Sequence, residues 1–321
     1  MGSIVVIVSQ IPIAVSKAYS PGHITGFYSS PEDSLGHQDS KFQGSLGAGF
    51  SIDRGITSNV RVFSSAEKKY EIKLNGFSDY DLKVSKYVTE YYLNIVRKPV
   101  FLSVDHVSDL PIGFGLGSSG SAALSLSYAL NDALGTQFSE IQAAQIAHEA
   151  DICCNTGRGT VISEFVGGLE IRVDIGGPGI GRVIKTELPK DWFVVILCIE
   201  PIDTAFYLSD KFSLIKRRSM NFLGNQMTKI LEKNNTVKNF LELSHDFASE
   251  FGITTERCHK PLNQLKSEGI VSSVALFGHT LFTLVKSESL KTVCEILKEH
   301  PGKLMVCRID NLGARLLGDS V

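Results

Sequence analysis

A run of glycines and serines between Pro111 and Ser121 has the residue types and spacing best suited to bind an anion. It leads directly into an alanine- and leucine-rich tract that favours a helix. A glycine-rich turn that opens a helix leaves backbone N–H groups unpaired at the positive end of the helix dipole, where glycine lets an anion come close. We therefore predict that a nucleotide triphosphate contacts Pro111, Gly113, Gly115, Leu116, Gly117, Ser118, Ser119, Gly120 and Ser121.

The same run allows other interpretations. Residues 115–120 match the dinucleotide pattern G-x-G-x-x-G, which needs a preceding parallel strand and an acidic residue about 20 positions later. Here a proline intervenes, and a helix end with a loop occupies the later position. The Walker pattern and the G-x-S-x-G of hydrolases do not occur. A purely structural turn is the remaining alternative.

Composition limits the class of protein. The 321 residues are enough for two domains, and 43% hydrophobic with 21% charged residues are ordinary values that exclude a disordered chain. A net charge of −2 gives no basic footprint for nucleic acid. The six cysteines form no C-x-x-C pair, which argues against a zinc site and favours a reducing, cytoplasmic location. We expect neither a nucleic acid nor a membrane as partner, because the sequence has no apolar stretch of about 18 residues.

Periodicity and turn residues predict a mixture of strands and helices. We expect a polar turn at 20–26, a helix that Ser118 caps and Gly135 ends, and a further helix that begins with a capping box at Ser139 and Gln142. The predicted strands are 4–19, 52–63, 70–74, 100–107, 170–175, 182–187, 193–199, a pair within 271–285 and 303–309; further helices are 80–96, two or three within 205–266, and 289–300.

The run from Pro111 to Ala122 resembles the phosphate motif of the GHMP superfamily of small-molecule kinases. Residues 20–23 (Ser-Pro-Gly-His) are similar to the N-terminal Ala-Pro-Gly-Lys segment of that superfamily, and residues 274–280 fall where its third, glycine-rich motif lies. The resemblance implies an α+β fold of two domains. The N-terminal domain, residues 1–188, would be of the ribosomal-protein-S5-like α/β type, and the C-terminal domain, residues 189–321, of the ferredoxin-like α+β type.

The resemblance also implies ATP and Mg²⁺ as cofactors. Ser119 matches the serine that helps to hold Mg²⁺ in the superfamily. Glu149 precedes Thr160 by the interval that separates a metal-binding Glu from a catalytic Asp in mevalonate-kinase-like members. The resemblance therefore predicts Ser119 and Glu149 as metal ligands, with Asp151 as a nearby substitute.

The chain departs from the superfamily pattern at Thr160, because a threonine cannot act as a carboxylate base. Homoserine kinases also lack this Asp, so positioning and electrostatics would then support the transfer, unless Glu164 or His148 supplies a base. His23 stands where the superfamily has a lysine and would donate a hydrogen bond to substrate or phosphate. The predicted catalytic residues are His23, Arg158 and Thr160.

Three segments, residues 20–27, 44–50 and 156–161, resemble the archaeal pantoate kinases more narrowly. This implies a hydroxy-acid substrate, pantoate, phosphorylated on its 4-hydroxyl to give 4-phosphopantoate for coenzyme A synthesis. Arg158 is the candidate for binding its carboxylate, with Arg61 and Arg172 as further options. Alternatives are a homoserine- or mevalonate-like kinase and a catalytically silent ligand sensor. A homodimer is left open as a further partner.

Overall fold

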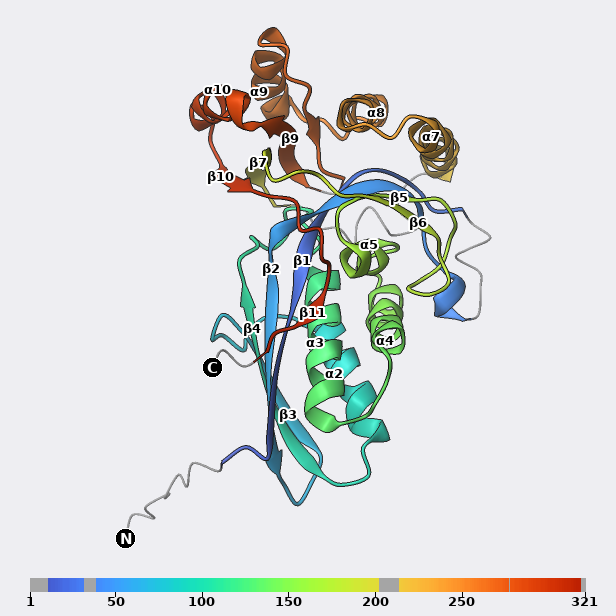
Figure 1. Ribbon diagram of the computed structural model, residues 1–321, viewed down its shortest axis with the longest axis vertical. Coiled ribbons are helices and arrows are strands. Elements are labelled where there is room, and N and C mark those ends of the chain that lie inside the picture. The colour runs from blue at the N-terminus through green and yellow to red at the C-terminus, as the bar shows by residue number, and fades with distance from the viewer. Residues whose placement is uncertain (1–10, 32–38, 202–213, 277, 319–321) are drawn as a thin grey trace.

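The computed structural model describes residues 11–31, 39–201, 214–276 and 278–318, and its strands form two sheets (Figure 1). The strands are β1 (Ala14–Ser29), β2 (Leu46–Ser64), β3 (Lys69–Leu74), β4 (Val100–Ser108), β5 (Leu169–Arg172), β6 (Val183–Thr186), β7 (Trp192–Glu200), β8 (Ser273–Val274), β9 (His279–Lys286), β10 (Lys303–Cys307) and β11 (Arg315–Leu316). The helices are the 3₁₀ turn η1 (Ser40–Phe42), α2 (Lys83–Ile95), α3 (Ser118–Leu134), α4 (Glu140–Cys153), α5 (Thr160–Val166), α7 (Leu214–Lys233), α8 (Val237–Glu250), α9 (Glu256–Ser267) and α10 (Ser287–Lys298).

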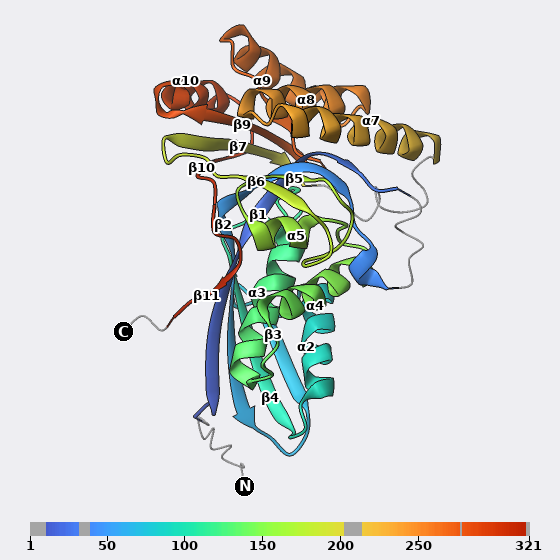
Figure 2. The same cartoon turned by 45° about the vertical axis from the view of Figure 1, so that its right-hand side comes forward.

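The first sheet contains the two longest strands, β1 and β2, which pair along nearly their whole length. Its order is β11-β1-β2-β4-β3; β5 pairs with the first half of β2, and β6 pairs with β5. Helices α2, α3 and α4 pack against one face of this sheet, as Figures 1 and 2 show. Strands β3 and β4 are parallel, and α2 makes the crossover that a parallel pair requires.

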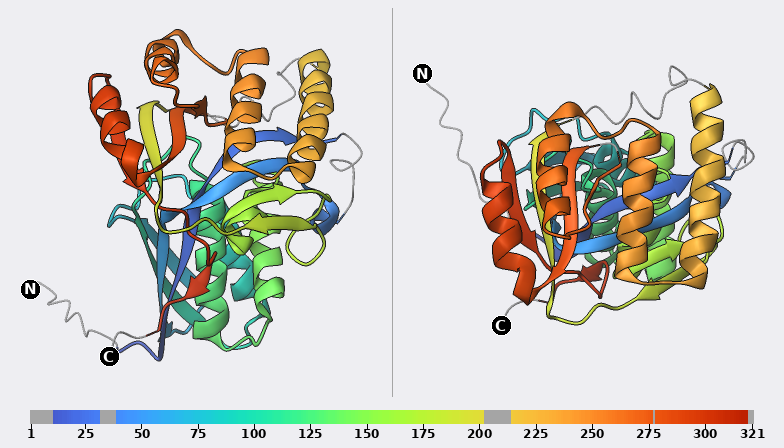
Figure 3. Two further views of the ribbon diagram at one scale, coloured as in Figure 1. Left: turned by 45° about the horizontal axis from the view of Figure 1, so that its top comes forward. Right: turned by 90° about the horizontal axis from the view of Figure 1, so that it is seen from above.

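The second sheet, in the order β10-β7-β9-β8, begins shortly after the predicted boundary at residue 188. Helices α8, α9 and α10 pack against its strands, whereas α7 lies beside α8 over β1 and β2 of the first sheet (Figure 3). Two sheets with segregated helices confirm the predicted α+β class. The division into residues 1–188 and 189–321 stays a prediction, and strand β11 returns from the second segment to pair with β1 at Tyr19 and Ala18.

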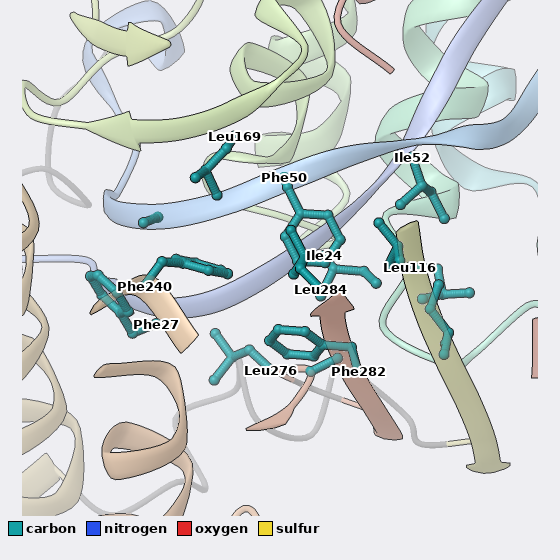
Figure 4. Close-up of a cluster of buried hydrophobic side chains, with 14 of the residues drawn as sticks. Ile24, Phe27, Phe50, Ile52, Leu116, Leu169, Phe240, Leu276, Phe282 and Leu284 are labelled. Carbon is teal, nitrogen blue, oxygen red and sulfur yellow. The ribbon is translucent and has the colours of Figure 1, made fainter. Parts of the chain in front are cut away.

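One hydrophobic core lies between the two sheets. Phe50 on β2 contacts Phe282 on β9 with ring centroids 5.4 Å apart, and Phe240 of α8 packs edge-on against Phe50 at 5.9 Å. Figure 4 shows these rings together with Ile24 and Leu284. Because β1 and β2 continue from the first sheet into this core, residues along them are held by both halves of the molecule.

Most predicted elements are present among the described residues, with two informative differences; residues 4–10 of the first predicted strand and 205–213 of the predicted helices lie outside the described residues. The turn expected at residues 20–26 is instead part of β1, because bulges after Pro21 and Thr25 accommodate these residues while pairing with β2 continues. The short helix α5 was not predicted. Among the described residues no helix has the length and apolar character to span a membrane.

Candidate active site

A cavity of about 470 Å³ lies at the N-terminal end of α3. Three backbone segments line most of it: the turn before α2, the loop before α3 and the loop between α4 and α5. The side chains of His23 and Arg172 also line it, and both are 1–2% exposed. Chain segments that are distant in sequence therefore meet at one concave site.

The glycine-rich loop has the backbone conformation that an anion site requires. Gly113, Gly115 and Gly117 all have φ between 69° and 84°, a region that disfavours other residues. Gly117 is the N-cap of α3, although Ser118 was predicted there, and no side chain caps the first turn. The N–H groups of that turn thus remain available at the positive end of the helix.

The predicted phosphate residues divide into two groups. Those that line the cavity are Gly113, Gly115, Leu116, Gly117, Ser118 and Ser119. Gly120 and Ser121 lie buried beneath the loop, and Pro111 is half-buried outside the lining. The third glycine-rich motif supports the loop from the other sheet, because the Thr280 hydroxyl donates to the Phe114 carbonyl across 2.8 Å.

The carboxylate beside Ser119 belongs to Asp151, whereas Glu149 was predicted. Asp151 accepts hydrogen bonds at Oδ1 from the hydroxyls of Thr156 (2.6 Å) and Ser119 (3.4 Å). Its Oδ2 is buried and has no partner among the described residues. Burial raises the pKa of Asp151 to about 6. Glu149 instead accepts a hydrogen bond from Tyr87 across 2.6 Å and does not line the cavity.

A buried charged network connects β1 with β5 at the wall of the cavity. Oε1 of Glu170 accepts hydrogen bonds from Nη1 of Arg172 (2.6 Å) and from Nε2 of His23 (2.9 Å). Arg172 also donates to the Ser163 hydroxyl across 2.7 Å, while its Nε is buried without a partner among the described residues. Both His23 and Arg172 of this network are among the residues that line the cavity.

The remaining predicted residues lie at different depths of the site. Thr160 begins α5 and lines the cavity; its Cγ2 and the backbone N of His23 are each 3.0 Å from the point where a Cβ on Gly117 would stand. Arg158 lines the cavity half-buried and donates to Asn155 across 3.0 Å. Arg61 pairs with Asp105 on the sheet and is not part of the lining.

Neither alternative base reaches the cavity directly. His148 is held by the carbonyls of Ser40 and Gln43, at 3.2 and 3.1 Å. Glu164 is completely buried beneath the glycine-rich loop, with Oε1 3.0 Å from the hydroxyl of Ser121. Neither residue is part of the lining.

Hydrogen-bond counting defines the protonation of Glu164. The Ser121 oxygen has three oxygen neighbours: the carbonyls of Pro21 (2.6 Å) and Gly117 (3.1 Å) and the Glu164 carboxyl. One hydroxyl has a single hydrogen, which satisfies the nearest carbonyl, so the carboxyl must be the donor of the remaining contact. Burial and then the charge of Asp151 raise the pKa of Glu164 well above its ordinary value, consistent with a neutral acid.

Sequence reasoning missed Glu170 and left Arg172 as one option among three. A signal was present, because Glu170 and Arg172 alternate with the apolar residues Leu169, Ile171 and Val173. In a strand this spacing puts the two opposite charges on one face. A charged pair on a strand that is otherwise apolar indicates a buried polar site.

Comparison with known proteins gives similarity over the whole chain. The family model described as "GHMP kinases N terminal domain" matches residues 82–167. The pantoate kinase of Methanocaldococcus jannaschii is 32% identical, covering 91% of this chain and 99% of that protein. The pantoate kinase of Thermococcus kodakarensis is 28% identical, covering 88% of this chain and 92% of that protein.

Solved structures agree on the fold. A structure described as a phosphotransferase related to the CoA biosynthesis pathway has a TM-score of 0.85 at 24% identity, over 96% of this chain and 99% of the other. The homoserine kinase of Cytophaga hutchinsonii has a TM-score of 0.68 at 16% identity, covering 96% of this chain and 99% of the other. At these identities the two structures support the α+β architecture of the whole chain.

Proposed function

Because this chain belongs to the GHMP kinase family, we propose that it transfers the γ-phosphoryl group of ATP to the 4-hydroxyl of pantoate. The observation that supports this most directly is one cavity with two different anion sites. The bare first turn of α3 suits a polyphosphate, and the buried guanidinium of Arg172 suits a carboxylate. The similarity to two pantoate kinases supports the choice of acceptor.

The residues around Ser119 fit a divalent cation. Mg²⁺ prefers oxygen ligands and usually takes one or two carboxylates together with phosphate oxygens and waters. Asp151 offers an oxygen without a partner among the described residues, next to the Ser119 hydroxyl and the first turn of α3. We therefore assign Ser119 and Asp151, in place of Glu149, as the residues that would hold Mg²⁺. When bound, the ion would neutralise charge on the phosphates.

Arg172 is the better partner for the acceptor carboxylate than the predicted Arg158. It is 2% exposed, and Glu170 and Ser163 fix the position of its guanidinium. Its Nε has no partner among the described residues, so a carboxylate would satisfy a donor that is otherwise lost. Arg158 is half-buried and already donates to Asn155.

The proposal is tested by measuring ADP release from ATP and Mg²⁺ against pantoate, homoserine, mevalonate and related hydroxy acids. Turnover should be highest with pantoate, and the phosphorus NMR signal of the product should couple to the protons of carbon 4. Turnover only with another acid would replace the acceptor and keep the kinase. Binding of ATP without turnover of any acid would favour the catalytically silent sensor. The presence of Thr160 in place of an Asp is the observation that favours this alternative.

A further inference from the structure

We propose that His23 accepts the proton of the acceptor hydroxyl during phosphoryl transfer, and that Glu170 is the residue that orients it. The inference rests on the proposed kinase function. It answers a question that the sequence raises, because Thr160 stands where the superfamily has its catalytic carboxylate. The structure includes His23 in the lining of the same cavity, and the backbone N of His23 and the Cγ2 of Thr160 are each 3.0 Å from the position that a Cβ on Gly117 would take.

The hydrogen bonds around Glu170 define which nitrogen of His23 has the proton. Burial alone would raise the pKa of Glu170, but Arg172 and the hydrogen bond from His23 outweigh it, so the pKa is lowered and the carboxyl is ionised. An ionised carboxylate only accepts hydrogen bonds. Nε2 of His23, 2.9 Å from Oε1 of Glu170, must therefore be the donor. In a neutral ring this leaves the lone pair on Nδ1.

The surroundings of His23 keep the imidazole neutral. The charged groups that act on it are Glu170 and Arg172 on β5, and the neutral acid Glu164 of α5 lies behind Gly117. Burial is the largest cause that lowers the pKa of His23; Arg172 acts in the same direction, and Glu170 opposes both. A neutral imidazole with a carboxylate behind it is the arrangement that serves as a general base toward a hydroxyl.

The second nitrogen of His23, Nδ1, contacts another residue of the cavity lining. His23 and Thr25 lie on the same face of β1, both line the cavity, and Nδ1 is 3.4 Å from the Thr25 hydroxyl. Asp81 is the carboxylate in the lining, at the turn before α2, and it pairs with Lys83 and Lys86 across 3.3 and 3.8 Å. Among the described residues that line the cavity, His23 therefore offers a lone pair that is not engaged in an ion pair and can receive a proton.

The step conserves atoms and charge. The hydroxyl oxygen of the acceptor forms a bond to the γ-phosphorus while the bond between that phosphorus and the bridging oxygen of ADP breaks, and ADP leaves with the electron pair. The hydroxyl proton moves to Nδ1 of His23. The resulting imidazolium is stabilised by Glu170 and returns its proton to water after the product leaves.

The test compares His23→Gln and Glu170→Gln in the full chain with ATP, Mg²⁺ and pantoate. Loss of a general base lowers kcat by about 10²–10⁴-fold, with little change in the KM for either substrate. An amide at position 170 can donate to Nε2, which would put the ring proton on Nδ1, so Glu170→Gln should lower kcat as well. His245→Gln, on α8 and bonded to the Ser272 carbonyl, is the matched histidine control and should leave kcat unchanged.

Two further measurements separate proton transfer from a merely structural role. Thr160→Asp, introduced into the His23→Gln chain, should recover part of the lost kcat. The wild-type kcat, measured at saturating Mg²⁺ to limit protonation of Asp151, should fall at a pH below 6.5, the ordinary pKa of histidine, as His23 becomes protonated, and the His23→Gln chain should show a smaller fall.

An unchanged kcat in folded His23→Gln would overturn the proposal, as would a wild-type kcat that stays flat down to the pH at which the fold is lost. A flat wild-type profile overturns the proposal even if the variants fail to fold. Failure of the proposed acceptor is distinguishable, because the wild-type chain would then turn over another hydroxy acid, on which the same variants are compared.

Discussion

Asp151 and Ser119 meet across 3.4 Å, and this contact joins the last turn of α4 to the first turn of α3. The predicted ligand Glu149 lies only two residues earlier on α4. Successive residues on a helix are about 100° apart, so these two carboxylates point in nearly opposite directions. Asp151 faces the glycine-rich loop, and Glu149 faces Tyr87 on α2.

Asp151→Asn should lower kcat or the apparent Mg²⁺ affinity by at least about tenfold, the lower end of what removal of a metal-orienting group costs. Glu149→Gln, two residues away, should change neither by more than about twofold because its carboxylate contacts only a tyrosine among the hydrogen bonds described. Steady-state kinetics over a range of Mg²⁺ concentrations measures both. The reverse ranking would return the metal to the position predicted from the sequence.

Arg172→Lys should raise the KM for pantoate by about 10²-fold, because the bidentate fork is lost although the charge is kept. The KM for ATP should change much less, since Arg172 contacts Glu170 and Ser163 rather than the glycine-rich loop. Arg158→Lys is the comparison and should have the weaker effect on the KM for pantoate. Equal effects of the two variants would contradict the assignment of the carboxylate to Arg172.

Glu164→Gln should leave kcat and the melting temperature nearly unchanged, because an amide reproduces the hydrogen bond that the neutral acid donates to Ser121. Glu164→Ala should be destabilised by about 2–3 kcal/mol, since it leaves a cavity and an unpaired hydroxyl under the loop. Thermal melts and steady-state kinetics on both variants measure these effects. A folded Glu164→Gln chain without activity would show that this carboxyl takes part in proton transfer.

The burial of His106 should make the stability of the fold depend on pH. It is buried between Ser58 (2.8 Å) and Ser85 (3.0 Å), and burial lowers its pKa from 6.5 to about 4. As the pH falls, the unfolded chain therefore binds the proton before the folded chain does. The contribution of neutral His106 to the free energy of unfolding is fully present above pH 6.5 and is lost as the pH falls toward 4. The whole pKa shift corresponds to about 3 kcal/mol. His106→Gln should show a smaller loss between pH 7.5 and 5 in urea unfolding. An equal loss of unfolding free energy in the wild-type and His106→Gln chains over this pH range would contradict the role of His106.

Local patterns in the sequence were sufficient to predict most helices and strands. The capping box at Ser139 and Gln142 and the stop at Gly135 are present as predicted, because each depends on residues within one turn of the helix. The strand through Pro21 and Gly22 was missed because two bulges and a long partner strand override the local preference for a turn. The short helix α5 likewise has too few residues to show a period.

The site was predictable to the extent that a single segment builds it. The glycine-rich loop is such a segment, and its positive φ values match the spacing of its glycines. The choice between Glu149 and Asp151 depends on the rotation of α4 against α3, and the role of Arg172 depends on the pairing of β5 with β2. These relationships involve residues far apart in the chain, so neither can be derived from spacing along it.

Strand β11 leaves the ribosome after every other described strand, yet its partner β1 leaves before all of them. During synthesis the edge of β1 near Ala18 and Tyr19 therefore stays open until residues 315 and 316 have been translated. Open strand edges promote association between nascent polypeptides. This short part of the edge would thus be covered only when Arg315 and Leu316 arrive, long after the extended β1–β2 hairpin has been translated.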